Sequence, residues 1–103
     1  MLGCDIVKVS RFKNNLSKLA NKILSESEII EFNKTTNKIQ YIAGRWAAKE
    51  AIFKATGYRK MTILNSTTGS PYVVNNSNIK ISISHEKEYA IAVALLVCHN
   101  KTS

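Results

Sequence analysis

The hydrophobic period of the chain changes once, near Gly57, and this change limits the folds that the chain can adopt. Before Gly57 a short apolar run at residues 2–7 is followed by apolar residues three and four positions apart, which predicts a strand and then helices. After Gly57 the period falls to two, which predicts strands. The order of one strand, three helices and four strands predicts an α+β fold, with the helices packed on one face of a mainly antiparallel sheet.

Three helices are expected before the change of period. The first covers residues 11–24, where apolar residues have helical spacing. The second opens at Ser25, because Ser25 and Glu28 have the spacing of a capping box. The third and longest covers about residues 39–56, and Gly57 provides a C-terminal stop.

Four strand-like runs are expected after Gly57. They cover residues 61–64, 72–74, 79–84 and 89–98. The third run alternates cleanly between apolar and polar side chains, which is typical of a half-buried strand. The last run has apolar side chains at odd and at even positions, so we expect a strand buried on both faces.

Length and composition are those of one domain, residues 1–103. The net charge of +8 favours acidic partners, which include nucleic acid, anionic lipid, a phosphorylated cofactor and an acidic protein. Cys4 and Cys98 form neither a disulfide framework nor a metal-ligand pattern, so we expect reduced, mostly buried thiols. The longest apolar run, residues 90–98, is too short to cross a bilayer, and no signal peptide is expected. We therefore expect a cytoplasmic protein with no membrane partner.

Four residues have the chemistry of a site for a divalent metal and a phosphorylated ligand. Asp5 interrupts an apolar strand and is either a strand-end carboxylate or an oxygen ligand for Mg²⁺. Glu50 and Lys54 lie one helical turn apart, and one interpretation is an exposed ion pair. The alternative is that a metal ion is the partner of Glu50, because the alanines around it indicate close packing, where an acid needs a partner. His85 ends a strand at a polar turn, where both structural and ligand-binding histidines occur.

Two more cations, Arg45 and Lys49, lie on a neighbouring face of the same predicted helix. Each alone is expected to be solvated. Together with Lys54 they could neutralise phosphates.

Three segments of the sequence resemble the motifs of one family. GCDIVKVSRF resembles an opening G-x-D-I-x-x-x-x-R-[IF] motif, and AGRWAAKEAIFKATG resembles a central [FW]-[AS]-x-KE-[AS]-x-x-K-A-x-G motif. ISISHEKEYAIAVAL is similar to a third, S-[IL]-[ST]-H-x-x-x-[YF]-A. The segments keep the order of the motifs and cover nearly the whole chain. By them the chain resembles the holo-acyl-carrier-protein synthases, the small prokaryotic type of 4′-phosphopantetheinyl transferase.

The resemblance implies an enzyme that moves 4′-phosphopantetheine from coenzyme A to a serine of apo-acyl carrier protein, releasing adenosine 3′,5′-bisphosphate. Asp5 and Glu50 match the two Mg²⁺ ligands, and Lys54 matches the lysine that contacts the pyrophosphate, so Glu50 and Lys54 are the expected catalytic residues. Arg11 matches a basic residue that meets the carrier protein. Relatives are typically homotrimers with active sites at subunit junctions. The positions that match the lining of the coenzyme A site are Arg45, Lys54, Gly57, Pro71 and His85.

Some points stay open at the level of sequence. The base that takes the serine proton is Glu50 or a metal-bound water. The strand before Asp5 and the segment after Gly57 are shorter than the family pattern, which bears on substrate affinity and trimer packing. A basic nucleic-acid-binding module is the main rival, but the charges are spread out and no aromatic run interleaves with them, so we expect no nucleic-acid partner. A degenerate paralogue would have lost a metal ligand or Lys54, and all three residues are present.

Overall fold

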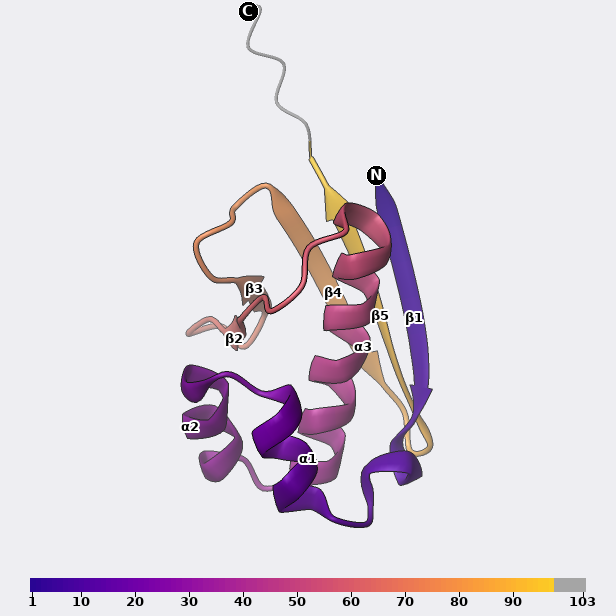
Figure 1. The fold of residues 1–103 in the computed structure, drawn as a ribbon, viewed down its shortest axis with the longest axis vertical. Helices are drawn as coiled ribbons and strands as arrows, with labels where there is room; N and C mark the ends of the chain where they lie inside the picture. The colour runs from indigo at the N-terminus through magenta and orange to yellow at the C-terminus, as the bar shows by residue number, and fades with distance from the viewer. Residues whose placement is uncertain (98–103) are drawn as a thin grey trace, which may run out of the picture.

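A long helix lies across one face of a three-stranded sheet in the computed structural model, which describes residues 1–97 (Figure 1). The sheet has the order β1-β5-β4 with antiparallel neighbours, and β2 and β3 form a separate antiparallel pair. The α+β class and the mainly antiparallel pairing are therefore confirmed. In chain order the elements are β1 (Leu2–Lys8), the 3₁₀ helix η1 (Val9–Phe12), α1 (Leu16–Ile23), α2 (Glu26–Lys34), α3 (Lys38–Thr56), β2 (Ile63–Asn65), β3 (Pro71–Val73), β4 (Ile79–His85) and β5 (Tyr89–Leu96).

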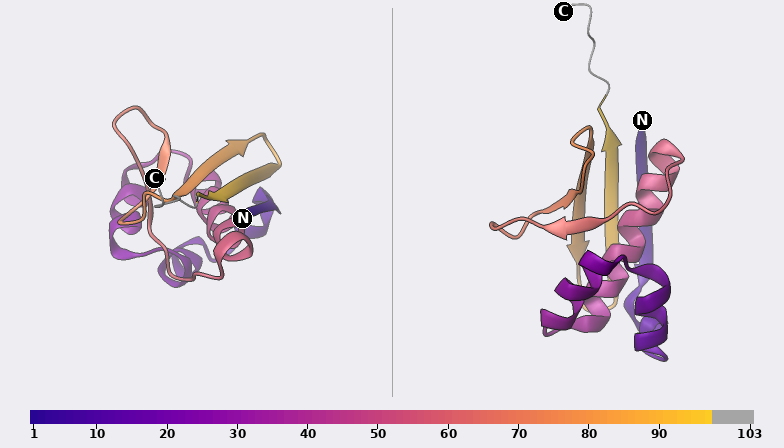
Figure 2. Two further views of the ribbon diagram at one scale, coloured as in Figure 1. Left: turned by 90° about the horizontal axis from the view of Figure 1, so that it is seen from above. Right: turned by 60° about the vertical axis from the view of Figure 1, so that its left-hand side comes forward.

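Local signals set the ends of the helices. Ser25 and Glu28 form the predicted capping box at the start of α2. Gly57 ends α3 with a positive φ of 79°, a conformation that favours glycine. The first helix differs from the prediction: Asn15, at φ 59°, separates η1 from α1, so α1 begins only at Leu16. Helices α1 and α2 pack beside α3 rather than on the sheet, and the β2–β3 pair projects away from it (Figure 2).

Small residues bring α3 close to the sheet. A Cβ added to Gly3 of β1 would overlap the carbonyl oxygen of Ala51 and would lie 2.8 Å from the backbone nitrogen of Ala55. Only glycine fits this crossing, so the backbone of β1 lies directly against the second half of α3. Asp5 follows two residues later on the same face of the strand and is thereby carried to α3. The other small residues at this contact, all with no exposed surface, are Ala47, Ala48, Ala51, Ala90, Ala92 and Ala94.

The face of the sheet away from α3 is apolar and exposed. The prediction that the last strand is buried on both faces was wrong: Ile91, Val93 and Leu95 are 38–43% exposed. The alanines of β5 face the helix because only small side chains fit there, which leaves the large side chains on the outer face. The exposed apolar residues of this outer face are Leu2 and Ile6 of β1 with Ile91, Val93 and Leu95 of β5. Below, this set is called the outer sheet face.

Two further expectations concern the cysteines and the membrane. Cys4 is exposed, so the expectation of a buried thiol was wrong there, and Cys98 lies outside the described residues. Within residues 1–97, α3 is the longest helix and none is apolar enough over a sufficient length to span a bilayer.

Candidate active site

Asp5 and Lys54 form an ion pair where β1 crosses α3. The Lys54 Nζ atom donates to Asp5 Oδ1 at 3.0 Å and to the Cys4 carbonyl oxygen at 3.1 Å. The hydrogen bond that Lys54 donates to Asp5, followed by the negative charge of Asp5 and a smaller effect of Glu50, raises the pKa of Lys54, so its ammonium group stays charged. The side chain of Asp5 is mostly shielded from solvent, whereas that of Lys54 is exposed.

Glu50 lies one turn before Lys54 on α3 and is half-buried. The ion pairs among residues 1–97 do not include its carboxylate. Its charge contributes to the raised pKa of Lys54, as does that of Asp5. The described part of the chain has no group of three or more His, Cys, Asp or Glu side chains suited to a metal, so the protein donors available here are the two carboxylates.

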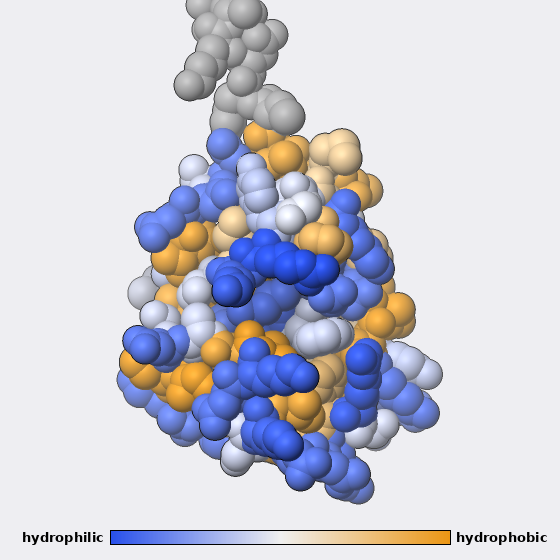
Figure 3. All heavy atoms as spheres, viewed as in Figure 1, coloured by the Kyte–Doolittle hydropathy of each residue, from blue (hydrophilic) through white to orange (hydrophobic). Residues whose placement is uncertain are grey.

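A cavity of about 430 Å³, the Trp46 pocket, opens beside Glu50 between α1, η1, α3 and residues 58–61. The ring of Trp46 packs against Phe12, with ring centroids 6.2 Å apart. The guanidinium of Arg11 lies 5.2 Å from the centre of the Trp46 ring. Cations from three elements join Arg11 around these apolar walls: Lys22, Lys49, Arg59 and Lys60. The mixture of hydrophilic and apolar side chains on this side of the molecule is visible in Figure 3.

A second cavity, of about 320 Å³, is the Arg45 pocket. Arg45, Pro71 and His85 all line it, and no acidic residue does. His85 reaches α3 over Gly44, where a Cβ would lie 2.7 Å from the imidazole Nε2. Partial burial and the Arg45 charge lower the pKa of His85, opposed by a hydrogen bond to the backbone of Gln40, so the imidazole is neutral at pH 7.

The predicted site residues thus fall into two groups on one chain. Asp5 contacts Lys54 at the β1–α3 crossing, Glu50 lies one helical turn before Lys54, and Gly57 follows at the end of α3 as its C-cap. Arg45, with Pro71 and His85, lies elsewhere: nine residues separate Arg45 from Lys54, about half a circle around the helix and about 13 Å along it. The two groups therefore lie on opposite faces of α3. Arg11 belongs to neither group and borders the Trp46 pocket.

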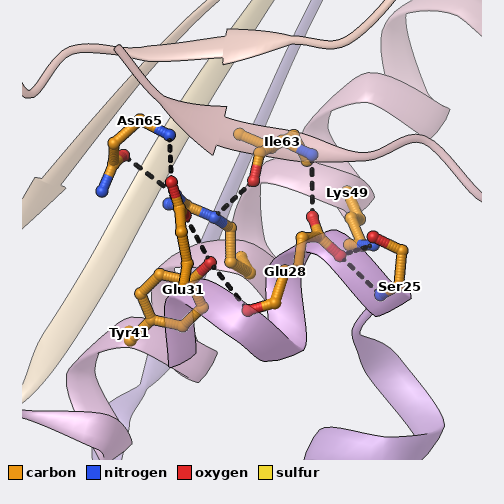
Figure 4. A network of polar contacts seen from close by, with 8 residues as sticks. Ser25, Glu28, Glu31, Tyr41, Lys49, Ile63 and Asn65 are labelled. Atoms are coloured by element: carbon orange, nitrogen blue, oxygen red, sulfur yellow. Dashed lines mark hydrogen bonds and ion pairs between the residues drawn. The ribbon is translucent and has the colours of Figure 1, made fainter. Parts of the chain in front are cut away.

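The expectation that Arg45 and Lys49 are solvated was wrong, because both belong to a network with two acids of α2 (Figure 4). Glu28, with no exposed surface, accepts from Lys49 Nζ at 2.7 Å and from the Ile63 backbone at 2.7 Å. Glu31 accepts from Arg45 Nη2 at 3.0 Å. The capping box identified Glu28 as a helix-start residue, but its distant partners and the role of Glu31 have no local signal in the sequence.

Comparisons with known proteins agree with this arrangement over most of the chain. The 4′-phosphopantetheinyl transferase superfamily profile matches residues 1–94. A holo-[acyl-carrier-protein] synthase of Mycoplasma mycoides subsp. mycoides is 43% identical over 108 residues, covering 97% of this chain and 96% of its own. The Bacillus anthracis holo-(acyl-carrier-protein) synthase in complex with CoA (3′,5′-ADP) superposes with a TM-score of 0.80 at 31% identity, covering 90% of this chain and 91% of that one.

A third relative is the Helicobacter pylori holo-[acyl-carrier-protein] synthase in complex with coenzyme A. Its TM-score is 0.76 at 28% identity, and the superposition covers 93% of this chain and 99% of the other. The fold and the length of the chain both agree with those of these relatives. The chain belongs to the 4′-phosphopantetheinyl transferase superfamily and, within it, to the holo-acyl-carrier-protein synthases.

Proposed function

We infer that the protein transfers the 4′-phosphopantetheine group of coenzyme A to a serine of apo-acyl carrier protein. The observation that carries this inference is the family match over residues 1–94, with Asp5, Glu50 and Lys54 all present and grouped. In the reaction a bond forms between the serine oxygen and the pantetheine phosphorus. The bond from that phosphorus to adenosine 3′,5′-bisphosphate breaks, and the serine proton passes to a base. We further propose that the chain acts as one domain, residues 1–103, in the cytoplasm.

Asp5 and Glu50 are proposed to hold one Mg²⁺ ion. The donor set fits this ion, because Mg²⁺ in phosphate-transfer sites commonly takes one or two carboxylates and fills its other positions with phosphate and water oxygens. The Lys54 ammonium group lies 3.0 Å from Asp5 Oδ1 and neutralises this carboxylate in the free protein. When bound, Mg²⁺ neutralises the pyrophosphate and polarises the phosphoryl group under attack.

Lys54 is proposed to stabilise charge on the departing bisphosphate. It is exposed, and the raised pKa keeps it protonated at neutral pH. An exposed ion pair such as Asp5–Lys54 is weak, so Lys54 can leave Asp5 for a phosphate at little cost. An ammonium group beside the leaving oxygen acts where charge develops in the transition state.

The active site is proposed to form between subunits of a homotrimer. Two observations support this: the groups around Lys54 and Arg45 lie on opposite faces of α3, and the outer sheet face exposes a strip of large apolar side chains. A neighbouring copy that covers the outer sheet face would remove apolar surface from water. It could also bring its Arg45, Pro71 and His85 toward Lys54 and Gly57, so that one coenzyme A molecule touches both groups. Val93→Lys should then lower the molar mass measured by light scattering to that of one chain, whereas an unchanged trimer would contradict this interface.

The carrier protein is proposed to dock at the Trp46 pocket, next to Glu50. Arg11, Lys22, Arg59 and Lys60 surround apolar walls there, a combination that suits an acidic protein with an apolar contact at its centre. Charges of this kind mainly increase the rate of encounter, so the transfer rate should fall as salt is added. Arg11→Ala should reduce that salt dependence.

Mass spectrometry of apo-acyl carrier protein, incubated with coenzyme A, Mg²⁺ and this protein, tests the proposed function. We expect a mass gain of one phosphopantetheine group, and no gain with Asp5→Asn protein. An unchanged mass with the wild-type protein, under conditions where a known synthase completes the reaction, would contradict the proposal. Tight RNA binding together with no coenzyme A affinity would instead favour the nucleic-acid rival.

A further inference from the structure

The guanidinium of Arg45 is buried and held along one edge by hydrogen bonds. Its Nε atom donates to the Ile63 carbonyl oxygen at 2.9 Å. Its Nη2 atom donates to Glu31 Oε1 at 3.0 Å and to Asn65 Oδ1 at 2.9 Å. A guanidinium has five N–H donors, so these bonds use the Nε–H and both N–H groups of Nη2. The two N–H groups of Nη1 remain.

The Nη1 atom of Arg45 is the part of the guanidinium without a hydrogen bond among residues 1–97. Among residues 1–97, each side-chain nitrogen or oxygen that is fully shielded from solvent has a hydrogen-bond partner. The hydrogen bonds of Arg45 in the described part of the chain are those of Nε and Nη2. Nη1 must therefore reach solvent, although the residue is only 4% exposed. Arg45 lines the Arg45 pocket, and Nη1 is the guanidinium nitrogen still free to donate to a ligand there.

Glu31 joins the groups that hold Arg45 in this orientation. Its Oε1 atom also accepts from the Tyr41 hydroxyl at 2.6 Å, and its Oε2 atom accepts from the Asn65 backbone at 2.8 Å. The Tyr41 ring in turn lies 4.4 Å from the Arg45 guanidinium. We propose that Glu31 is a positioning residue that fixes the plane of Arg45 so that Nη1 meets the 3′-phosphate of coenzyme A. This inference rests on the proposed function.

The 3′-phosphate is the part of the ligand that suits the Arg45 pocket. Coenzyme A carries two separated anionic groups, the pyrophosphate and the phosphate on the ribose 3′ position. The pyrophosphate is assigned above to Asp5, Glu50 and Lys54, which lie on the other face of α3. Arg45 and His85 are the lining residues that can carry positive charge in the second pocket, and they suit the second anionic group.

Charge alone would give Glu31 the opposite effect. A carboxylate close to the pocket lowers the positive potential there, so its removal would tighten phosphate binding if Glu31 did nothing else. Removal of a group that orients Arg45 should weaken phosphate binding, because a guanidinium recognises phosphate through the direction of its N–H groups. The sign of the change in affinity separates the two roles.

The test compares coenzyme A with 3′-dephospho-coenzyme A as substrates of the wild-type enzyme and its variants, with apo-acyl carrier protein as acceptor. For Glu31→Ala we expect the KM for coenzyme A to rise about tenfold while kcat stays within about twofold. The KM for 3′-dephospho-coenzyme A should stay within about twofold, because that substrate lacks the phosphate. Glu31→Gln keeps one acceptor for Arg45 or Tyr41 and should raise the KM for coenzyme A about threefold.

Arg45→Ala provides the matched comparison. Because a positioning residue acts through its partner, adding Glu31→Ala to Arg45→Ala should raise the KM for coenzyme A no further. Calorimetric titration with adenosine 3′,5′-bisphosphate and with adenosine 5′-monophosphate repeats the comparison without catalysis. Thermal unfolding shows whether each variant folds, and Glu31→Gln carries the test if Glu31→Ala does not.

Two results would overturn the role of Glu31. Equal rises of KM for both substrates, with or without a fall in kcat, would mean that Glu31 only maintains the fold. A selective fall of KM for coenzyme A would make Glu31 a competing anion rather than a positioning residue. A wild-type protein that transfers nothing to the carrier protein would overturn the proposed function itself, which is a separate outcome.

Discussion

Gly3→Ala should damage stability and the active site together, because Gly3 is where β1 crosses α3. The added Cβ would overlap the Ala51 carbonyl oxygen and would lie 2.8 Å from the Ala55 nitrogen, where ordinary contacts begin at 3.4 Å. Both atoms belong to the helix backbone, so no side chain can move aside. To remove the clash with the Ala55 nitrogen alone, β1 would have to move by about 0.6 Å, and the overlap with the Ala51 oxygen requires a larger movement.

The cost follows from this displacement. Overpacking against a rigid neighbour costs up to about 3 kcal/mol of unfolding free energy, and we expect Gly3→Ala to lie at this end. Asp5 moves with β1, so its 3.0 Å contact with Lys54 should lengthen or break. Misplacement of a reacting group by about 1 Å can lower a rate by about 100-fold, and the loss of kcat/KM should approach that size.

Urea unfolding and the carrier-protein transfer assay measure the two effects. Gly69→Ala is the matched control, because nothing lies within 4 Å of its added Cβ and only its positive φ of 91° opposes the change. It should cost about 1 kcal/mol. Ala51→Gly should not rescue Gly3→Ala, because the obstructing atom is the backbone oxygen of Ala51. A Gly3→Ala protein as stable and active as the wild type would refute the close crossing.

Two other perturbations address the polar groups. Glu28→Gln should lower the free energy of unfolding, measured by urea titration, by about 3 kcal/mol, because it leaves the Lys49 ammonium group without its buried counter-ion. As a control, Glu26→Gln at an exposed position should change this free energy by less than about 0.5 kcal/mol. For His85, whose pKa is lowered in the free protein, a bound phosphate should favour the protonated imidazole, so binding through His85 should strengthen as pH falls from about 8 to about 6. The ratio of coenzyme A affinities of wild-type and His85→Gln protein, measured by calorimetry, should therefore increase over that interval, and a constant ratio would contradict contact with the phosphate.

Features governed by neighbours in sequence were predictable. The capping box of Ser25 and Glu28 and the glycine stop at Gly57 depend on hydrogen bonds and backbone conformations within a few residues, and both are present. The change from helical to alternating period gave the correct class and the number of strands, because each period reflects burial of one face. Asp5 and Lys54 are in contact, as their places in the motifs led us to expect, whereas the roles of Asp5, Glu50 and Lys54 stay predictions.

Features governed by distant neighbours were not predictable. The last strand is apolar on both faces, and only the alanine- and glycine-lined approach of α3 shows which face is covered within one chain. The sequence predicts a solvated Arg45, because the groups that accept its hydrogen bonds, on Ile63, Asn65 and Glu31, are 14–20 residues away along the chain. The break at Asn15, with its left-handed backbone, has no proline or glycine to mark it.

The central claim is that Asp5 and Glu50 together coordinate one divalent cation at the β1–α3 crossing. Titration with Mn²⁺, a spectroscopic substitute for Mg²⁺, followed by electron paramagnetic resonance in the presence of coenzyme A, measures this directly. The account predicts one tight Mn²⁺ per chain in the wild-type protein and at least about tenfold weaker binding in both Asp5→Asn and Glu50→Gln. Unchanged Mn²⁺ binding in both variants, with Glu26→Gln as the charge-matched control, would contradict it.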